Sequence, residues 1–212
     1  MTSNLDLRER AELCDLFVRL GPSAPTLCEG WTTFDLACHL AIRERDPRSA
    51  PGILFGGPFA SYTNKLMERE SRRGFPAVVA RVRTLPRGPL RLAPLRAAMS
   101  LVEYTVHHED VRRANGEGPR RDRPDLQEAI WGMLGRLGPL MARRAHTGRR
   151  LELVASGTTS GARGLGKGPV VTLTGDPVEL LLYLYGRRGA AIVQMAGAEA
   201  DRAAVEAANF GL

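Results

Sequence analysis

Hydrophobic and polar residues alternate at helical spacing over most of the chain. Between positions 4 and 20, leucines and a phenylalanine recur every three or four residues among charged ones, which predicts an amphipathic helix. The same criterion predicts further helices at 32–45, 60–84, 94–115 and 124–146. Gly74 and Pro76 fall inside the third of these and are candidate breaks. Residues 47–60 are rich in proline and glycine and predict a loop.

The helix predicted at 32–45 has a clear start. Thr32 is followed three residues later by Asp35, the pattern of a capping box in which side chains satisfy the first backbone N–H groups. Trp31 stands where an apolar residue often packs against the first turn. Pro47 disfavours helical backbone at the residue before it, so the helix is expected to end near Arg45.

The pattern changes after residue 148. Residues 150–156 and 169–175 alternate or run apolar over strand lengths. The glycine-rich segment 157–168 between them predicts a turn or a mobile loop, and both a lid and a disordered stretch are open. A helix is expected at 176–186, with Asp176 as N-cap and Pro177 as its first residue, then a strand at 190–197 and a helix at 198–208. The sequence therefore predicts a mainly α fold: an up-and-down helical bundle over residues 1–147 and a small α/β domain over 148–212.

Composition narrows the class of protein. Apolar residues make up 43% and charged residues 25% of the 212, which is typical of a globular domain, and no stretch is long and apolar enough to span a membrane. The first residues are charged and lack the apolar core of a secretory signal, so a cytoplasmic protein is expected. The three cysteines show no CxxC spacing and are expected to be free thiols. Cys38 and His39 are adjacent on a helix and diverge by about 100°, which disfavours a catalytic pair.

The net charge of +7 raises the question of nucleic-acid binding. Arginine pairs recur at 112–113, 120–121, 143–144, 149–150 and 187–188. They are scattered along the chain, and no aromatic residues alternate with them to stack on bases. A solvated arginine-rich surface is therefore favoured over a nucleic-acid interface.

Glu103 and His107 are the first candidates for chemistry. They lie four residues apart on the predicted helix 94–115, at the border of an apolar stripe that includes Val102 and Val106. A buried carboxylate beside a buried imidazole is costly unless each has a partner. Either a mutual hydrogen bond or a divalent metal ion satisfies both groups.

A metal ion needs a third ligand, and the chain has only four histidines. His108 points about 100° away from His107, and His146 stands at a helix end beside arginines. His39 lies on the inward side of the helix predicted at 32–45, where facing helices bring it toward Glu103 and His107. The residues leave both alternatives open: satisfied core histidines, or a site of two histidines and one carboxylate with free positions for water or substrate. Such a donor set suits several metals and does not choose between them; zinc is expected, and nickel or iron is also compatible.

The same residues carry a resemblance to a known family. Trp31 followed by Asp-Leu-x-x-His-Leu over residues 35–40, and Glu-x-x-x-His-x-x-Asp over residues 103–110, resemble the DinB-like metal-binding bundles. The similarity is greatest to the actinobacterial branch named for the N-terminal domain of mycothiol-dependent maleylpyruvate isomerase. It implies that His39, Glu103 and His107 are the metal ligands. The apolar helix and Gly186-Arg187 resemble the C-terminal domain of that family, which implies that Arg187 lies near the site.

The resemblance also implies a reaction. Mycothiol is expected as cosubstrate, with the metal holding its sulfur as thiolate for attack on a small electrophile, in an isomerase or a thiol transferase. Asp110, or Asp35 one turn before His39, is a candidate to orient a ligand imidazole. Arg43, one turn after His39, is a candidate for binding a substrate carboxylate.

Alternatives remain at this stage. Arg43 is equally well explained as a surface residue paired with Glu44 or Asp46. The bundle is also compatible with a metal-stabilised binding or regulatory module without turnover, and, less well, with an arginine-rich nucleic-acid binder. A small-molecule substrate and no membrane partner are expected, and monomer and homodimer are both open.

Overall fold

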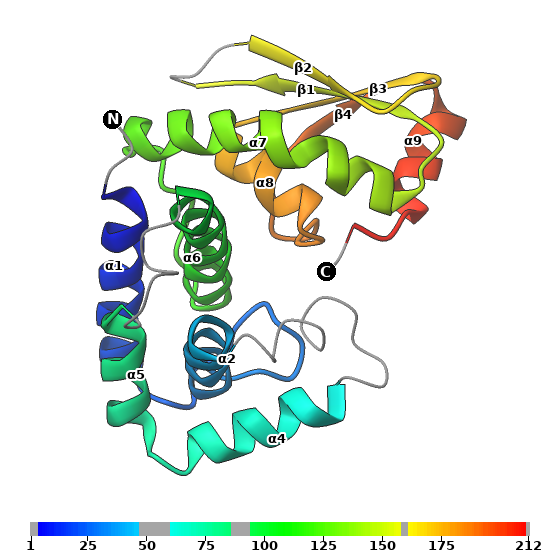
Figure 1. The fold of residues 1–212 in the computed structure, drawn as a ribbon. Helices are drawn as coiled ribbons and strands as arrows, with labels where there is room; N and C mark the ends of the chain where they lie inside the picture. The colour runs from blue at the N-terminus through cyan, green and yellow to red at the C-terminus, as the bar shows by residue number, and fades with distance from the viewer. Residues whose placement is uncertain (1–3, 47–59, 86–93, 158–160, 211–212) are drawn as a thin grey trace. The chain divides into compact units, whose positions relative to one another are not determined.

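The computed structural model describes residues 4–46, 60–85, 94–157 and 161–210. These residues form two compact units, one up to Gly118 and one from Pro119 onward. The loop predicted at 47–60 and the irregular segment before residue 94 lie almost entirely outside the described residues. The described part of the chain is mainly helical with one small four-stranded sheet, as the sequence predicts (Figure 1).

Among its described residues, the first unit consists of helices joined by turns and loops. It contains α1 (Leu5–Leu20), α2 (Thr33–Arg45), α4 (Ala60–Ser71), α5 (Phe75–Arg83) and α6 (Pro94–Ala114). The single helix expected at 60–84 is therefore two, because Gly74 adopts a φ of +80°, which L side chains rarely reach, and Pro76 starts the next helix. The capping box predicted for α2 is confirmed: the Thr32 hydroxyl accepts the Asp35 N–H, and the Asp35 carboxylate accepts the Thr32 N–H at 2.9 Å.

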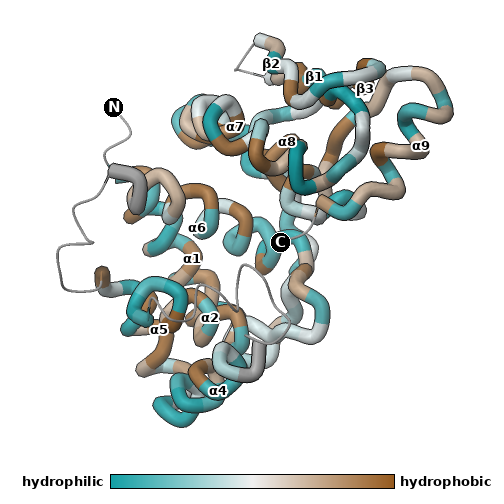
Figure 2. Tube along the Cα trace, turned by 45° about the vertical axis from the view of Figure 1, so that its right-hand side comes forward, coloured by the Kyte–Doolittle hydropathy of each residue, from teal (hydrophilic) through white to brown (hydrophobic). Residues whose placement is uncertain are grey.

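The core of this unit lies where α1, α2 and α5 meet residues of α6. Figure 2 shows the hydrophobic positions of these helices gathered on their facing sides, while α4 carries many hydrophilic ones. The fully buried members include Leu13, Phe17, Leu36, Leu40 and Val78. Leu36 and Leu40 are four residues apart, so α2 directs one face into this core.

One buried charge joins four of the helices. Arg10 of α1 is 2% exposed, and its guanidinium makes a two-pronged ion pair with Glu44 of α2. The same guanidinium donates to the carbonyl oxygen of Val82 in α5 at 2.6 Å and lies 4.3 Å from the ring centre of Tyr104 in α6. The ion pair of Arg10 thus constrains both the distance between α1 and α2 and the rotation of α2 about its own axis.

The second unit combines α7 (Pro124–Ala145), α8 (Pro177–Leu184) and α9 (Glu199–Ala207) with β1 (Arg150–Ala155), β2 (Gly161–Leu165), β3 (Val170–Gly175) and β4 (Gln194–Ala196). The strand order is β2-β1-β3-β4, with β1 parallel to β3 and both edge strands antiparallel to their neighbours. Leu151 and Leu153 of β1, and Val171 and Leu173 of β3, are fully buried on one face of the sheet. In Figure 1, α7 and α8 lie along the sheet on the same side.

Two expectations for this region need correction. The glycine-rich segment 157–168 is predicted to be a turn or a mobile loop, but Gly161–Leu165 pair with β1 as a strand; residues 158–160 are outside the described part. The strand expected at 190–197 is only Gln194–Ala196. Glycine has weak strand propensity, so the ladder with β1 and the burial of Leu165, not local sequence, account for β2.

Helix α7 packs on this sheet, so the compact units divide after Gly118 and not near the position 147 at which the sequence changes character. A methyl group on Gly138 would meet the side chain of Leu165, which shows how closely helix and strand approach. The Arg163 guanidinium of β2 lies 4.5 Å from the ring centre of Trp131 in α7. No described helix is long and apolar enough to cross a membrane.

Replacing Arg10 with Ala is expected to destabilise the protein by about 3–5 kcal/mol, because it leaves the largely buried Glu44 carboxylate without its counter-charge. Urea denaturation followed by circular dichroism measures the loss. The matched control is Arg72→Ala, since Arg72 and Glu68 form an ion pair at 74% and 66% side-chain exposure and should contribute less than about 0.5 kcal/mol. Equal effects of the two substitutions would contradict the role given to Arg10.

Candidate metal centre

Helices α2 and α6 face each other with polar residues, which on each helix are spaced about one turn apart. On α2, His39 and Arg43 share a face that is distinct from the Leu36–Leu40 face in the core. On α6, Glu103, His107 and Asp110 follow one another at spacings of four and three residues. The polar strip of one helix therefore meets the polar strip of the other.

The three residues proposed from spacing come together. His39, Glu103 and His107 each place one potential ligand atom so that all lie within 4.8 Å of one another. The His39 and His107 rings meet edge to face with centres 5.3 Å apart, and both side chains are buried. Two imidazoles and a carboxylate converging from two helices match the donor set of a catalytic divalent-metal site.

Glu103 is held by two partners, one on each oxygen. Its Oε1 lies 2.8 Å from an Arg43 guanidinium nitrogen, and its Oε2 lies 3.5 Å from Nε2 of His107. Burial raises the pKa of this carboxyl, but the hydrogen bond from His107 and the charges of Arg43, His107 and His39 outweigh it and lower the pKa to about 2. Glu103 is therefore ionised at any physiological pH, which a metal ligand requires.

His107 has different partners on its two ring nitrogens. Nδ1 lies 2.9 Å from Oδ2 of the fully buried Asp110, and Nε2 faces Glu103. Burial lowers the pKa of His107, but the hydrogen bonds with Asp110, Cys28 and Glu103 outweigh it and hold the pKa well above its usual value. The raised pKa favours a ring protonated on both nitrogens in the metal-free protein. A cation would displace the proton on Nε2, while the proton on Nδ1 stays directed at Asp110.

Of the two carboxylates that were candidates for orienting a ligand, only one contacts a candidate ligand in the described residues. Asp110 bonds His107, whereas the Asp35 carboxylate is engaged by Thr32 in the cap of α2. Arg43 pairs with Glu103 across the helices, which is the site-facing alternative and not a surface pair with Glu44. Arg187 belongs to the second unit, where its guanidinium donates to the carbonyl oxygen of Tyr185.

Cys28 is a neighbour of the site that the sequence did not single out. Its thiol donates to Oδ2 of Asp110 at 3.3 Å and lies 3.9 Å from Nδ1 of His107, so Cys28, His107 and Asp110 form a second potential ligand group. The only local signal is that Cys28 closely precedes Trp31 and the α2 cap. Cys38, in contrast, is buried, and burial with nearby Glu70 and Asp35 raises its pKa to about 12, which makes it a poor nucleophile. All three cysteines are free, as predicted.

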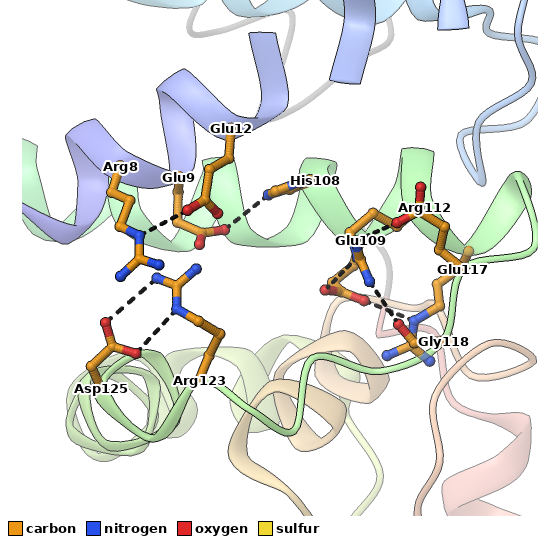
Figure 3. Close-up of polar contacts among 11 residues, drawn as sticks. Arg8, Glu9, Glu12, His108, Glu109, Arg112, Glu117, Gly118, Arg123 and Asp125 are labelled. Carbon is orange, nitrogen blue, oxygen red and sulfur yellow. Dashed lines mark hydrogen bonds and ion pairs between the residues drawn. The ribbon is translucent and has the colours of Figure 1, made fainter. Parts of the chain in front are cut away.

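A further potential ligand group, Glu9, Glu12 and His108, lies between α1 and α6 (Figure 3). Here the charges are already compensated in pairs: Nδ1 of His108 lies 3.2 Å from Glu9, and Arg8 donates to Glu12 at 2.8 Å. Farther along α6, Glu109 is fully buried and pairs with both Arg112 and Arg113. These pairs engage one of the arginine doublets that a nucleic-acid interface would need in contacts within the protein.

The chain resembles known proteins in its fold. No protein-family model matches the chain, and no curated protein matches it in sequence. Two solved structures resemble its fold: the mycothiol-dependent maleylpyruvate isomerase, with a TM-score of 0.53, and a histidine-to-alanine mutant of that enzyme, with a TM-score of 0.56. The chain has the fold of this isomerase. Each likeness covers 90% of this chain and 91% of the other at 17% identity, so the shared arrangement includes both the helical part and the sheet.

If His39, Glu103 and His107 are the ligands, His39→Ala and Glu103→Ala should each lower the metal content of the purified protein from about one equivalent to below about a tenth. Elemental analysis by mass spectrometry provides the measurement. Glu12→Gln is the control, because it removes a carboxylate from the ligand group between α1 and α6 and should leave the metal content unchanged. Loss of metal in the control alone would move the site to that group.

Arg43→Gln should tighten metal binding to the metal-free protein by roughly tenfold, or ~1.4 kcal/mol. The substitution keeps a hydrogen-bond donor near Oε1 of Glu103 but removes the positive charge that competes with a cation for this carboxylate. Calorimetric titration with zinc measures the change. Arg45→Gln is a suitable control, since Arg45 donates to the carbonyl oxygens of Arg81 and Thr84 instead. Weaker binding in Arg43→Gln would show that the guanidinium orients Glu103 and does not compete.

Proposed function

We propose that this protein is a divalent-metal enzyme that uses mycothiol, or a similar low-molecular-weight thiol, to transform a small electrophile. The observation that carries the proposal is the convergence of His39, Glu103 and His107 within 4.8 Å. The fold shared with a mycothiol-dependent isomerase supports it. An isomerase releases the thiol after it has added to the substrate, whereas a transferase leaves it in the product, and both are compatible with this site.

The three residues would hold the metal through two neutral imidazoles and one carboxylate, with zinc favoured and nickel or iron compatible. When bound, such an ion lowers the pKa of a coordinated thiol so that it is a thiolate near neutral pH. Asp110 keeps the His107 ring in the tautomer that offers Nε2. Burial of His39 and His107 limits access of water to the same face.

Two arginines are proposed to bind the substrate. Arg43 lies at the edge of the centre with a 19% exposed side chain, and a carboxylate on the electrophile would be attracted to the guanidinium that now pairs with Glu103. Arg187 is proposed for a similar role, on the resemblance of Gly186-Arg187 to the family pattern. The electrophile proposed on these grounds is a small, acid-bearing molecule.

The family assignment forms part of the proposal. The motifs around Trp31 and His39 and around Glu103 and Asp110 support membership of the DinB-like bundles, with an up-and-down order of helices in the first unit. A thiol-dependent enzyme with three free cysteines also fits the reducing cytoplasm.

Calorimetric titration of the zinc-loaded protein with mycothiol tests the function. We expect saturable binding that is lost on removal of the metal and in Glu103→Ala, because the thiolate requires the cation. Binding should be accompanied by release of about one proton per thiol, which titrations in buffers of different ionisation enthalpy detect. Metal binding without any thiol binding would favour the alternative, a metal-stabilised module without turnover. Equal thiol binding with and without metal would refute the proposed mechanism.

A further inference from the structure

The segment between α1 and α2 contacts both helices of the metal centre. Its Cys28 thiol donates to Oδ2 of Asp110, the same oxygen that lies 2.9 Å from Nδ1 of His107. Its Trp31 ring packs against His39 with ring centres 5.1 Å apart. One short piece of chain therefore reaches a candidate ligand on α2 directly and a candidate ligand on α6 through Asp110.

We propose that Cys28 is a positioning residue of the metal centre: its thiol holds the Asp110 carboxylate in the rotamer that fixes the His107 ring, with Nε2 turned toward His39 and Glu103. The proposal rests on the metal assignment made above but not on the thiol chemistry. It deepens that assignment by adding a residue that acts on the ligand set from outside it.

The geometry supports a defined position for the thiol. The Thr26 hydroxyl accepts the Cys28 N–H at 3.1 Å and donates to the Trp31 carbonyl oxygen at 2.9 Å. The Trp31 N–H donates to the Cys28 carbonyl oxygen at 3.0 Å and closes a four-residue β-turn. Its third residue, Gly30, has a φ of +74°, which glycine adopts without strain. The backbone of Cys28 is thus held in place, and the thiol reaches Asp110 from a defined position in the chain.

The segment is also attached to α6 at Asp110, the residue whose carboxylate contacts His107. The Leu27 N–H donates to the backbone carbonyl of Asp110 at 3.1 Å, one residue before the thiol reaches the Asp110 carboxylate. Main chain and side chain of Asp110 are therefore held by consecutive residues. A carboxylate with two directional hydrogen bonds to one oxygen has less freedom to rotate than one that bonds His107 alone.

Direct coordination by Cys28 is the competing explanation, since Cys28, His107 and Asp110 lie within 4.8 Å of one another. It would require a cation on Nδ1, where the 2.9 Å contact with Asp110 already accounts for the ring nitrogen. Positioning and coordination make different demands on the side chain at position 28. A hydroxyl can replace the hydrogen-bond donor, but it is a poor substitute for a soft thiolate ligand.

The test compares Cys28→Ser and Cys28→Ala in the full chain, using zinc affinity and the visible spectrum of the cobalt-substituted protein. We expect Cys28→Ser to bind zinc within about threefold of the parent and Cys28→Ala to bind it roughly tenfold more weakly, the lower end of the range for partners of ligands. The cobalt bands should shift in Cys28→Ala and return in Cys28→Ser. Thr26→Val should weaken binding in the same direction, and Thr26→Ser should restore it.

Cys14→Ala is the matched control for loss of a buried thiol. Its sulfur contacts the Val79 carbonyl in the core, so it should lower thermal stability and leave zinc affinity and the cobalt spectrum unchanged. Thermal unfolding of each metal-free variant separates a folding defect from an effect on the site.

Each other outcome overturns the inference. Unchanged or tighter zinc binding in Cys28→Ala means that the thiol does not position Asp110, while the metal centre itself stands. Equal, large losses in both Cys28 variants, with a thiolate-to-cobalt charge-transfer band in the parent, make Cys28 a ligand. Absence of metal from the parent protein removes this inference together with the proposed function.

Discussion

The negative charge of Glu103 constrains how α2 and α6 can meet. Its side chain is only 14% exposed, and a carboxylate at that depth is costly without counter-charges. Arg43 compensates one oxygen from α2 and His107 the other from the next turn of α6. An arrangement that separated the two helices would remove Arg43 and leave Glu103 with His107 alone, so the pairing that compensates both oxygens of this carboxylate is also the one that assembles the candidate metal centre.

Neighbouring positions of α6 serve different purposes because of helical geometry. His107 turns toward α2 and the metal centre, whereas His108, about 100° farther round, turns toward Glu9 of α1. Tyr104, one turn before His108, lies under the Arg10 guanidinium that joins α1 to α2. The face of α6 toward α1 thus packs the helix against the rest of the first unit, and the face toward α2 contributes Glu103 and His107 to the candidate metal centre.

The sequence predicted what depends on local rules and on charge. The helices and the capping box of α2 follow from periodicity and from side-chain hydrogen bonding. The trio His39, Glu103 and His107 follows from helical spacing, from the small number of histidines and from the family resemblance. Strand β2 could not be predicted, because its glycines gain order only by pairing with β1. Cys28 was missed for a related reason: it stands in a loop, 82 positions from the Asp110 that it contacts. Contacts of this kind depend on tertiary structure and leave no periodic signal.

The two ligand groups that share His107 cannot both be occupied while its ring is a neutral imidazole. A neutral ring has one lone pair, and the nitrogen that keeps its proton must donate it. Asp110 is an acceptor at 2.9 Å from Nδ1, fully buried and further held by Cys28, so the proton is best placed there. The lone pair then lies on Nε2, on the side of Glu103 and His39. The partners on the far side of the ring therefore decide which of the two groups is the metal centre, without contributing a ligand to it.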